Sequence, residues 1–244
     1  MSRIVVITGA GSGLGRAMAK RLARDGNTLV LLGRNYRKIQ QVVETLGERA
    51  LALSCDISDP NAVDEVFVEI ARRYGKIDVL INNAGVYEPV HIRDATNTQI
   101  SEALNINLAG PIYCSRAAIP LLERGGHIIN IGSVTVMTQI AMLALYQTAK
   151  AGLERFSKTL QQELAEDGIR VTLVRAGAMY DETSKLSVSP EVAQRFSEEN
   201  SKLRHPSHRP PTSRFDSVAE PIPMLIALPA DMNIPEVMLD ARHP

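Results

Sequence analysis

Two hydrophobic patterns alternate along most of the chain. Runs of apolar, often β-branched residues are typical of strands buried on both faces, and they occupy residues 4–8, 28–32, 50–55, 79–82, 127–131 and 171–174. Between these runs, apolar residues recur at helical spacing over residues 13–25, 35–46, 60–74, 98–122 and 144–166. Continuous apolar strands that alternate with helices predict an α/β fold, in which a doubly wound parallel sheet is covered by helices on both faces.

The pattern changes after about residue 175. Residues 180–214 are polar, although residues 190–203 keep helical spacing. A long insert of this kind is typical of a lid or a binding loop, and a disordered surface loop is the alternative. Residues 217–228 predict a helix that starts late or is kinked, because Pro221 and Pro223 cross it, and residues 237–239 predict a last short strand. We therefore expect one domain over residues 1–244 with a substrate loop or lid at 180–214.

Composition and charge narrow the functional classes. Lys and Arg number 27, as do Asp and Glu, so the net charge of zero does not favour nucleic acid or a membrane surface as partner. No apolar run is long enough for a transmembrane helix or a signal peptide, so the expected location is cytoplasmic. Cys55 and Cys114 have no CxxC or Cys/His cluster around them and are predicted to be buried. His205 and His208 are interpreted as loop residues, and no metal site is expected.

A glycine-rich turn, Thr8-Gly9-Ala10-Gly11-Ser12-Gly13-Leu14-Gly15, follows the first predicted strand and opens the first predicted helix. Glycines let the chain turn tightly and bring backbone N–H groups against a pyrophosphate at the helix N-terminus. At a strand–turn–helix junction, this motif predicts a dinucleotide site, and a plain structural turn is the alternative.

The residues that follow the next predicted strands bear on the choice of dinucleotide. An acid after the second strand would favour NAD, but the chain has Gly33-Arg34-Asn35, and an arginine fork suits the 2′-phosphate of NADP(H). The alternative is that Arg34 is a solvated loop charge. Asp56, after the third strand, either reaches an adenine or caps the next helix. Asn82-Asn83-Ala84-Gly85, after the fourth, allows close approach to a cofactor or forms a plain turn.

Tyr146 and Lys150 stand four residues apart in a predicted helix, so their side chains share one face. A lysine ammonium favours the phenolate and lowers a phenol pKa that is normally about 10, which prepares the tyrosine for proton transfer near neutral pH. Alone, this spacing is weak evidence, because many helices carry it by chance. Ser133 lies 13 residues before Tyr146 and supplies a possible second partner for a substrate oxygen.

Together, these motifs resemble those of the short-chain dehydrogenase/reductase family, in the branch whose members are single domains of about this length. The resemblance covers roughly residues 3–177. It rests on five motifs in order: Thr8-Gly9-x-x-x-Gly13-x-Gly15, Asn82-Asn83-Ala84-Gly85, Asn107 in Asn105-Ile106-Asn107-Leu108, Ser133, and Tyr146-x-x-x-Lys150. It implies a Rossmann-type sheet of about seven strands.

The resemblance also implies a role for each matching position. Tyr146 would be the acid/base, Lys150 would hold the nicotinamide ribose and depress the pKa of Tyr146, Ser133 would steady the substrate oxygen, and Asn107 would keep a water in the proton relay. The positions implied to bind the cofactor are Gly9, Ser12, Gly13, Leu14, Gly15, Arg34, Asn35, Asp56, Ile57, Asn83, Ala84, Gly85, Tyr146, Lys150, Gly177 and Met179.

The chain departs from the family after its sixth predicted strand. The family usually has Pro-Gly there, followed by a threonine that contacts a cofactor phosphate. Here Ala176-Gly177 takes that place, Asp181 occupies the usual offset of the threonine, and Thr183 comes two residues later. Gly177 is still expected to shape the turn. An aspartate near a phosphate would be unfavourable, so we expect the loop to follow a different path.

The implied reaction is hydride transfer between NADP(H) and a carbonyl carbon, which interconverts a carbonyl and a secondary alcohol. A non-catalytic NADP(H)-binding sensor or scaffold is the alternative, although such relatives typically lose the tyrosine or the lysine. Nucleotide-sugar epimerases have another glycine spacing and a longer chain. Thr135, Met142 and Tyr180 are candidate contacts for a small carbonyl or alcohol substrate. The resemblance further implies a homo-oligomer, either a dimer or a tetramer, and Ile112, Leu153, Phe156 and Leu160 face either a partner or the sheet.

Overall fold

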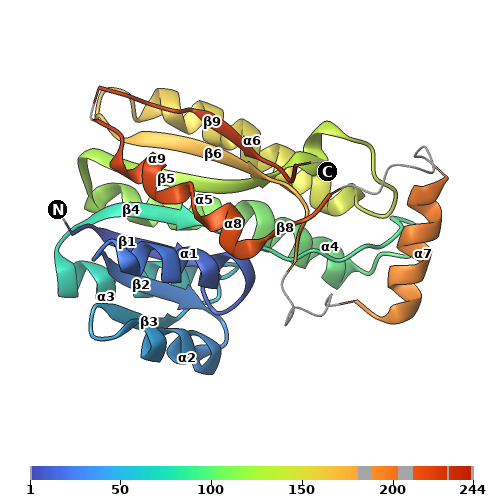
Figure 1. Ribbon diagram of the computed structural model, residues 1–244, viewed down its shortest axis with the longest axis horizontal. Coiled ribbons are helices and arrows are strands. Elements are labelled where there is room, and N and C mark those ends of the chain that lie inside the picture. Colours follow the sequence, from blue (N-terminus) through green and yellow to red (C-terminus); the bar gives the residue numbers. More distant parts are fainter. Residues whose placement is uncertain (1, 181–187, 203–210, 230, 243–244) are drawn as a thin grey trace.

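The computed structural model describes residues 2–180, 188–202, 211–229 and 231–242. Seven parallel strands form one sheet in the order β3-β2-β1-β4-β5-β6-β9 (Figure 1). Their bounds are β1 Ile4–Thr8, β2 Thr28–Gly33, β3 Ala50–Ser54, β4 Ile77–Asn82, β5 Leu122–Ser133, β6 Arg170–Ala176 and β9 Glu236–Leu239. The predicted α/β fold with its doubly wound parallel sheet is confirmed.

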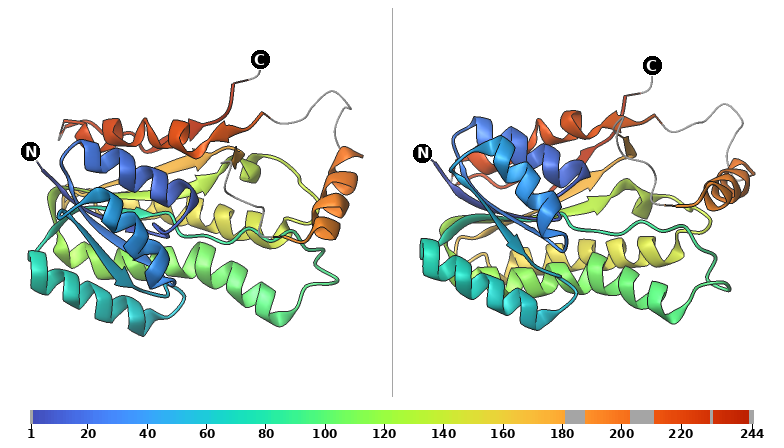
Figure 2. Two further views of the ribbon diagram at one scale, coloured as in Figure 1. Left: turned by 60° about the horizontal axis from the view of Figure 1, so that its bottom comes forward. Right: turned by 90° about the horizontal axis from the view of Figure 1, so that it is seen from below.

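Helices cover both faces of this sheet (Figures 1 and 2). On one face lie α1 (Gly13–Arg24), α2 (Tyr36–Leu46), α8 (Phe215–Ala219) and α9 (Ile222–Ala227), whose buried residues share a core with Val5 and Ile7 of β1. On the other face lie α3 (Pro60–Tyr74), α5 (Gly110–Ala118) and α6 (Ala144–Glu163), which share a core with Val6. Neighbouring residues of β1 thus serve opposite cores, which explains why its sequence is apolar throughout.

The long helix predicted over residues 98–122 is interrupted. It consists of α4 (Asn97–Leu104), a π-helical segment (Asn105–Ala109), α5 and a 3₁₀ turn (Ile119–Leu121). In the π segment, the N–H of Gly110 bonds the carbonyl of Asn105, five residues back. Single π turns of this kind are frequently found at functional sites. Strand β5 then begins at Leu122, earlier than predicted, where it pairs with Ile77 of β4.

Proline also divides the predicted helix over residues 217–228. Helix α8 ends at Ala219, just before Pro221, and α9 begins at Ile222 with Pro223 in its first turn. A proline is tolerated in a first turn because its missing N–H has no partner to lose there. The region is therefore two short helices rather than one kinked helix.

The polar insert leaves and rejoins the fold at one place. After β6, the short strand β7 (Met179–Tyr180) pairs in parallel with β8 (Ser213–Arg214), and the Ser213 N–H donates to the Ala178 carbonyl at 2.9 Å. Between these strands, α7 (Pro190–Ser201) lies beyond the carboxyl ends of the sheet strands (Figures 1 and 2). Asp181, Thr183, His205 and His208 lie outside the described residues, so the expectations for them stay untested.

Three further sequence expectations can be compared with the structure. Cys55 and Cys114 are both buried and free, as predicted. Of the four apolar residues that face either a partner or the sheet, Leu153 and Leu160 are buried, whereas Ile112 and Phe156 are partly exposed. Within the described ranges, no helix is both long and apolar enough to cross a membrane.

One buried histidine gives the fold a specific pH dependence. His127 of β5 is fully buried, and its Nε2 lies 2.8 Å from Thr172 Oγ1 on β6, while its Nδ1 has no hydrogen-bond partner among the described residues. Burial, with Arg170 and Arg3 nearby, lowers the pKa of His127 from 6.5 to about 3. Below about pH 6.5, the unfolded chain therefore binds a proton that the folded chain does not bind until about pH 3.

We predict that this difference makes the folded state lose stability as the pH falls from 6.5 towards 3. The loss attributable to His127 has a slope of at most about 1.4 kcal/mol per pH unit. Urea unfolding at a series of pH values measures it. His127→Gln should flatten the profile. Parallel profiles for wild type and His127→Gln would show that His127 does not titrate in this way.

Candidate active site

Three predicted catalytic side chains meet where β5 ends and α6 begins. Ser133 is the last residue of β5, and Tyr146 and Lys150 lie on one face of the first turns of α6. Ser133 is hydrogen-bonded to the Tyr146 hydroxyl. Lys150 Nζ donates to the Ile131 carbonyl at 2.8 Å and lies 5.9 Å from the centre of the Tyr146 ring. The structure thus brings these predicted residues together.

Burial controls the ionisation of two of these groups. It raises the pKa of Tyr146, and the hydrogen bond with Ser133 acts in the opposite direction. Burial also lowers the pKa of Lys150 to about 8. A phenol that exchanges a proton near neutral pH needs groups that favour its anion, and Ser133 is one of them. That Lys150 also lowers the pKa of Tyr146 stays a prediction.

Asn107 lies in the π segment and is fully buried. Its Oδ1 accepts from the Val86 N–H at 3.1 Å, and its Nδ2 donates at 3.0 Å to the carbonyls of both Val86 and Ala103. A side chain added at Gly85 would meet Asn107 Oδ1 at 2.8 Å and Lys150 Nζ at 3.7 Å. Asn107 therefore fixes the segment after β4 beside Lys150. Its predicted role in holding a water stays a prediction.

The glycine turn forms a cradle of main-chain groups. Gly9 and Gly13 have φ values of +67° and +51°, and a Cβ at Gly9 would lie 2.7 Å from Ala84 Cα. A Cβ at Gly15 would lie 2.3 Å from the Gly9 carbonyl oxygen. Ser12 is the N-cap of α1, but its side chain makes no capping hydrogen bond to the described helix. The N–H groups at this helix end suit an anionic ligand, so the residues fit the pyrophosphate of a dinucleotide.

The residues predicted to meet the adenosine differ in what they do. Asn35 caps α2, because its Oδ1 accepts from the Lys38 N–H at 3.1 Å. Asp56 Oδ1 accepts from the Ser58 N–H at 3.0 Å and from Ser58 Oγ at 2.7 Å. The cap of α3 is Asp59, so Asp56 does not have the capping role that was its alternative.

The other residues predicted to meet the adenosine are a cation, Arg34, and an apolar residue, Ile57. Arg34 is exposed directly after β2, and Ile57 is buried against Gly110. A Cβ at Gly11 would lie 3.1 Å from Lys38 Cβ, so the exposed Lys38 side chain starts beside the glycine turn. Sequence reasoning missed Lys38. Its place one turn into the helix that follows Arg34 was the available signal.

The turn after β6 is shaped by the close approach of Gly177 to Asp240. The Gly177 N–H donates to the Leu239 carbonyl at 2.8 Å, and a Cβ at Gly177 would lie 2.2 Å from Asp240 Oδ1. Gly177 is therefore required by its contact with Asp240, and its φ is not in the left-handed region. Met179 follows in β7 and packs against the core shared with α8.

The residues predicted to contact substrate occupy three different settings. Thr135 Oγ1 lies 2.9 Å from Ser133 Oγ, next to the candidate chemistry. Met142 is buried with φ +66°, an unusual conformation for a residue other than glycine, and its carbonyl accepts from the Val90 N–H at 2.8 Å. Tyr180 lies on β7 and is 47% exposed.

Sequence reasoning missed two aromatic residues near this site, Tyr87 beside Tyr146 and Phe196 beside Tyr87. The Tyr87 ring stands edge-on to the Tyr146 ring, with 5.2 Å between centroids, and the Phe196 ring stands edge-on to Tyr87 at 6.3 Å. Tyr87 follows β4, whereas Phe196 belongs to α7. No local pattern in the sequence connects these segments. Pairs with this geometry are attractive beyond the apolar area they bury.

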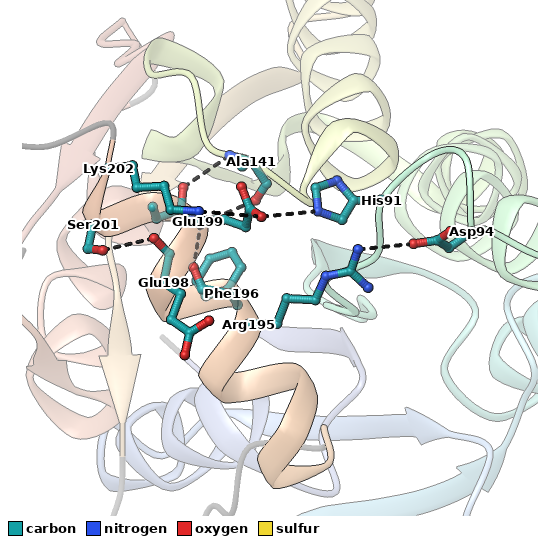
Figure 3. Close-up of polar contacts among 10 residues, drawn as sticks. His91, Asp94, Ala141, Arg195, Phe196, Glu198, Glu199, Ser201 and Lys202 are labelled. Atoms are coloured by element: carbon teal, nitrogen blue, oxygen red, sulfur yellow. Dashed lines mark hydrogen bonds and ion pairs between the residues drawn. The ribbon is translucent and has the colours of Figure 1, made fainter.

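Polar contacts hold α7 in this position (Figure 3). The buried Asn200 forms a two-way pair with Ala141: its Oδ1 accepts from the N–H at 3.0 Å, and its Nδ2 donates to the carbonyl at 3.3 Å. Arg195 contacts Asp94 at 3.3 Å, and Glu199 lies 4.0 Å from His91 (Figure 3). Because both partners of each ion pair are at least partly exposed, Asn200 is expected to be the stronger anchor.

The chain is similar to several known proteins. Residues 3–190 match the family model described as short chain dehydrogenase. Carbonyl reductase family member 4 of Danio rerio is 37% identical over 195 residues, which are 79% of this chain and 82% of that protein. A solved short chain dehydrogenase from Burkholderia cenocepacia in complex with NADP is 30% identical, with a TM-score of 0.82 over 98% of this chain and 96% of that one. An alcohol dehydrogenase from Thermococcus sibiricus, complexed with 5-hydroxy-NADP, is 25% identical, with a TM-score of 0.83 over 100% and 99%.

We predict that Asn200→Ala releases α7 from the loop before α6. The change leaves the N–H and C=O of Ala141 without their partner, at a local cost of about 1–3 kcal/mol. Amide hydrogen exchange at Ala141 and along α7 should become faster, while exchange in the sheet stays unchanged. Asn200→Asp keeps an acceptor but no donor and should be intermediate. The exposed Ser197→Ala is the control on the same helix, and equal exchange in Asn200→Ala and this control would contradict the assignment.

Proposed function

Because the chain belongs to the short-chain dehydrogenase/reductase family, we propose that it is an NADP(H)-dependent oxidoreductase that interconverts a carbonyl and a secondary alcohol. The observation that carries this proposal is the arrangement of Ser133, Tyr146 and Lys150 at the carboxyl ends of the strands, beside the glycine cradle. A proton donor, a second hydroxyl and a cation then converge on one place, as carbonyl reduction requires.

In the reducing direction, Tyr146 donates its proton to the carbonyl oxygen as that oxygen becomes an alkoxide. Ser133 donates a hydrogen bond to the same oxygen and stabilises the charge that develops there. Lys150 supplies positive charge behind the phenol, and Asn107 keeps the neighbouring segment in place. When bound, NADPH supplies the hydride. Oxidation of an alcohol uses the same groups in reverse, with the Tyr146 phenolate accepting the proton.

The expected binding mode of the cofactor follows the shape of the cradle. Gly9, Gly13 and Gly15 allow main-chain groups to approach the pyrophosphate, and no capping hydrogen bond to α1 occupies the Ser12 side chain. Arg34 lies where the adenosine 2′-phosphate of NADP(H) is expected, and its guanidinium makes no ion pair with a described residue. Lys38, whose side chain starts beside Gly11, adds a second cation to this end of the site. These cations support NADP(H) over NAD(H).

Residues 180–214 are proposed to form one wall of the substrate site. Phe196 and Tyr87 give that wall an apolar inner surface beside Tyr146, and Met142 is buried at the start of α6. Arg195 of α7 is paired with Asp94, and Glu199 lies 4.0 Å from His91. This arrangement supports a moderately hydrophobic carbonyl compound or alcohol as substrate, with Tyr180 as a further candidate contact.

A second copy of the chain is the proposed partner. A pocket of about 540 Å³ lies along residues 136–151 and includes Ala144, Thr148 and Ala151. At helical spacing, these residues share a face of α6 that is turned away from Tyr146 and Lys150. This face supports a contact between copies, and the partly exposed Ile112 and Phe156 are further candidates for such a contact.

The tyrosine assignment is tested by Tyr146→Phe. The variant keeps the ring and its packing but has no proton to transfer, so we expect kcat to fall at least about 100-fold while the Kd for NADPH stays nearly constant. NADPH oxidation against a panel of ketones, aldehydes and quinones measures kcat, and fluorescence titration measures the Kd. Tyr113→Phe on α5 is the control. Turnover by the Tyr146→Phe variant at the wild-type rate would reject the assignment.

The same panel distinguishes the non-catalytic alternative. A sensor or scaffold of this fold would bind NADPH without oxidising it in the presence of any carbonyl compound tested. Binding without turnover in the wild-type protein would therefore favour that alternative.

Arg34→Ala tests the cofactor preference. Loss of a charge-assisted contact with the 2′-phosphate should raise the Kd for NADPH roughly 10- to 100-fold and leave the Kd for NADH nearly unchanged. Arg24→Ala removes an exposed cation at the far end of α1 and is the control. If Arg34→Ala weakens both dinucleotides equally, or neither, Arg34 is not the group that selects NADP(H).

A further inference from the structure

Ser133 has more hydrogen-bond partners than its catalytic role requires. A serine hydroxyl has one proton to donate and two lone pairs that accept. The Thr135 N–H donates to Ser133 Oγ at 3.2 Å and occupies one lone pair. The Thr135 hydroxyl lies 2.9 Å from the same oxygen, and either group can be the donor of that bond. The direction of this bond decides what Ser133 has left for a substrate.

The two directions have different consequences. If Ser133 gives its proton to Thr135, it has no proton left for the Tyr146 oxygen or for a substrate oxygen. If Thr135 gives its proton to Ser133, both lone pairs of Ser133 are occupied, and its own O–H points to the remaining partner. The second arrangement also forms a chain of donors, in which each hydrogen bond polarises the next.

The surroundings of Thr135 favour the second direction. Its carbonyl is fixed from α6, because Gln147 Nε2 donates to it, and the Thr138 N–H donates to it at 3.2 Å. Gln147 is the residue after Tyr146, so the turn that carries Thr135 is tied to the helix that carries the phenol. The Thr135 hydroxyl is thereby held against Ser133. If Ser133 were the donor of their hydrogen bond, the Thr135 hydroxyl proton would need another acceptor, and leaving it unpaired in this half-buried position would cost free energy.

We infer that Thr135 is a positioning residue, which donates both its N–H and its O–H to Ser133 and so makes Ser133 a hydrogen-bond donor to the oxygen at the reaction centre. Sequence reasoning proposed Thr135 as a substrate contact, and this inference gives it a different task. The consequence for catalysis rests on the proposed function, since it concerns the same oxygen that Tyr146 protonates. Its effect on Tyr146 in the protein alone does not depend on any substrate.

The inference predicts how Tyr146 titrates. With Thr135 donating, the Ser133 O–H stabilises the Tyr146 phenolate. Thr135→Val keeps the N–H and the shape but removes the hydroxyl that polarises the Ser133 O–H. The phenolate is then stabilised less, so the pKa of Tyr146 should rise. Thr135→Ser keeps the hydroxyl and should restore the wild-type value. Thr138→Val is the matched control, because it removes a hydroxyl from the same turn. Among the described residues, that hydroxyl bonds the Thr135 carbonyl, at 3.4 Å, and not Ser133.

Ultraviolet difference titration of the phenol measures this pKa without turnover, and the titration of Tyr146→Phe is subtracted to isolate Tyr146. For carbonyl reduction, we expect kcat for Thr135→Val to fall roughly five- to tenfold, with the KM for NADPH unchanged, and Thr135→Ser to recover it. If Thr135→Val does not fold, as judged by thermal unfolding, Thr135→Ala supplies the same loss of the hydroxyl.

The outcomes separate this inference from the proposed function. An unchanged Tyr146 titration in Thr135→Val overturns the inference, whatever the turnover. A raised pKa that Thr135→Ser does not restore also overturns it, because a hydroxyl would then not be the cause. A raised pKa that Thr135→Ser restores, in a protein that reduces no carbonyl compound, supports the positioning of Ser133 and rejects the proposed function instead.

Discussion

The site depends on how one threonine ties together the ends of two strands. Thr8 ends β1, and its hydroxyl oxygen accepts hydrogen bonds from the N–H groups of Asn83 at 2.9 Å and Ala84 at 3.0 Å. Asn83 Nδ2 donates in return to the Thr8 carbonyl at 2.9 Å. Strands β1 and β4 are the neighbours at which the strand order of the sheet reverses, and ligands of such sheets bind in the crevice at that point. These bonds therefore fix the crevice in which the glycine turn faces the segment after β4.

The segment after β4 continues to Val86, where Asn107 holds the next peptide, and then to Tyr87, whose ring touches Tyr146. One short stretch of chain, from Asn83 to Tyr87, thus forms both one side of the crevice and the aromatic contact with Tyr146.

The features that the sequence predicts are those written in local patterns. The strands of the parallel sheet are buried on both faces, so each is a continuous apolar run that can be recognised without knowing its neighbours. The glycine turn and the Tyr146–Lys150 pair are equally local, because a turn and a helix place residues of fixed spacing in fixed relation. The predicted catalytic residues are therefore ones that the fold places close together: Asn107, Ser133, Tyr146 and Lys150.

The features that the sequence did not predict depend on contacts between distant segments. The π segment interrupts a region whose spacing is helical throughout, and its buried Asn107 amide bonds a peptide 21 residues away. Asn200 pairs with a peptide 59 residues away, and the edge-on rings of Tyr87 and Phe196 come from different elements. Helical periodicity also leaves open which apolar face is turned inward, so Leu153 and Phe156 of α6 were indistinguishable until the sheet was in place. Only the assembled fold supplies this information.

The parallel pairing of β7 with β8 affects how the segment between these strands can evolve. Since Tyr180 and Arg214 are held side by side, the chain between them starts and ends at one fixed point on the scaffold. Doubling the length of a chain whose ends are fixed in this way costs only about 0.6 kcal/mol in closure entropy. The intervening segment can thus be lengthened, shortened or exchanged as a cassette while the sheet, the cradle and Tyr146 keep their places. A change of substrate can then be concentrated in one continuous stretch of the gene, provided that the new segment again pairs with the N–H and C=O of Ala141.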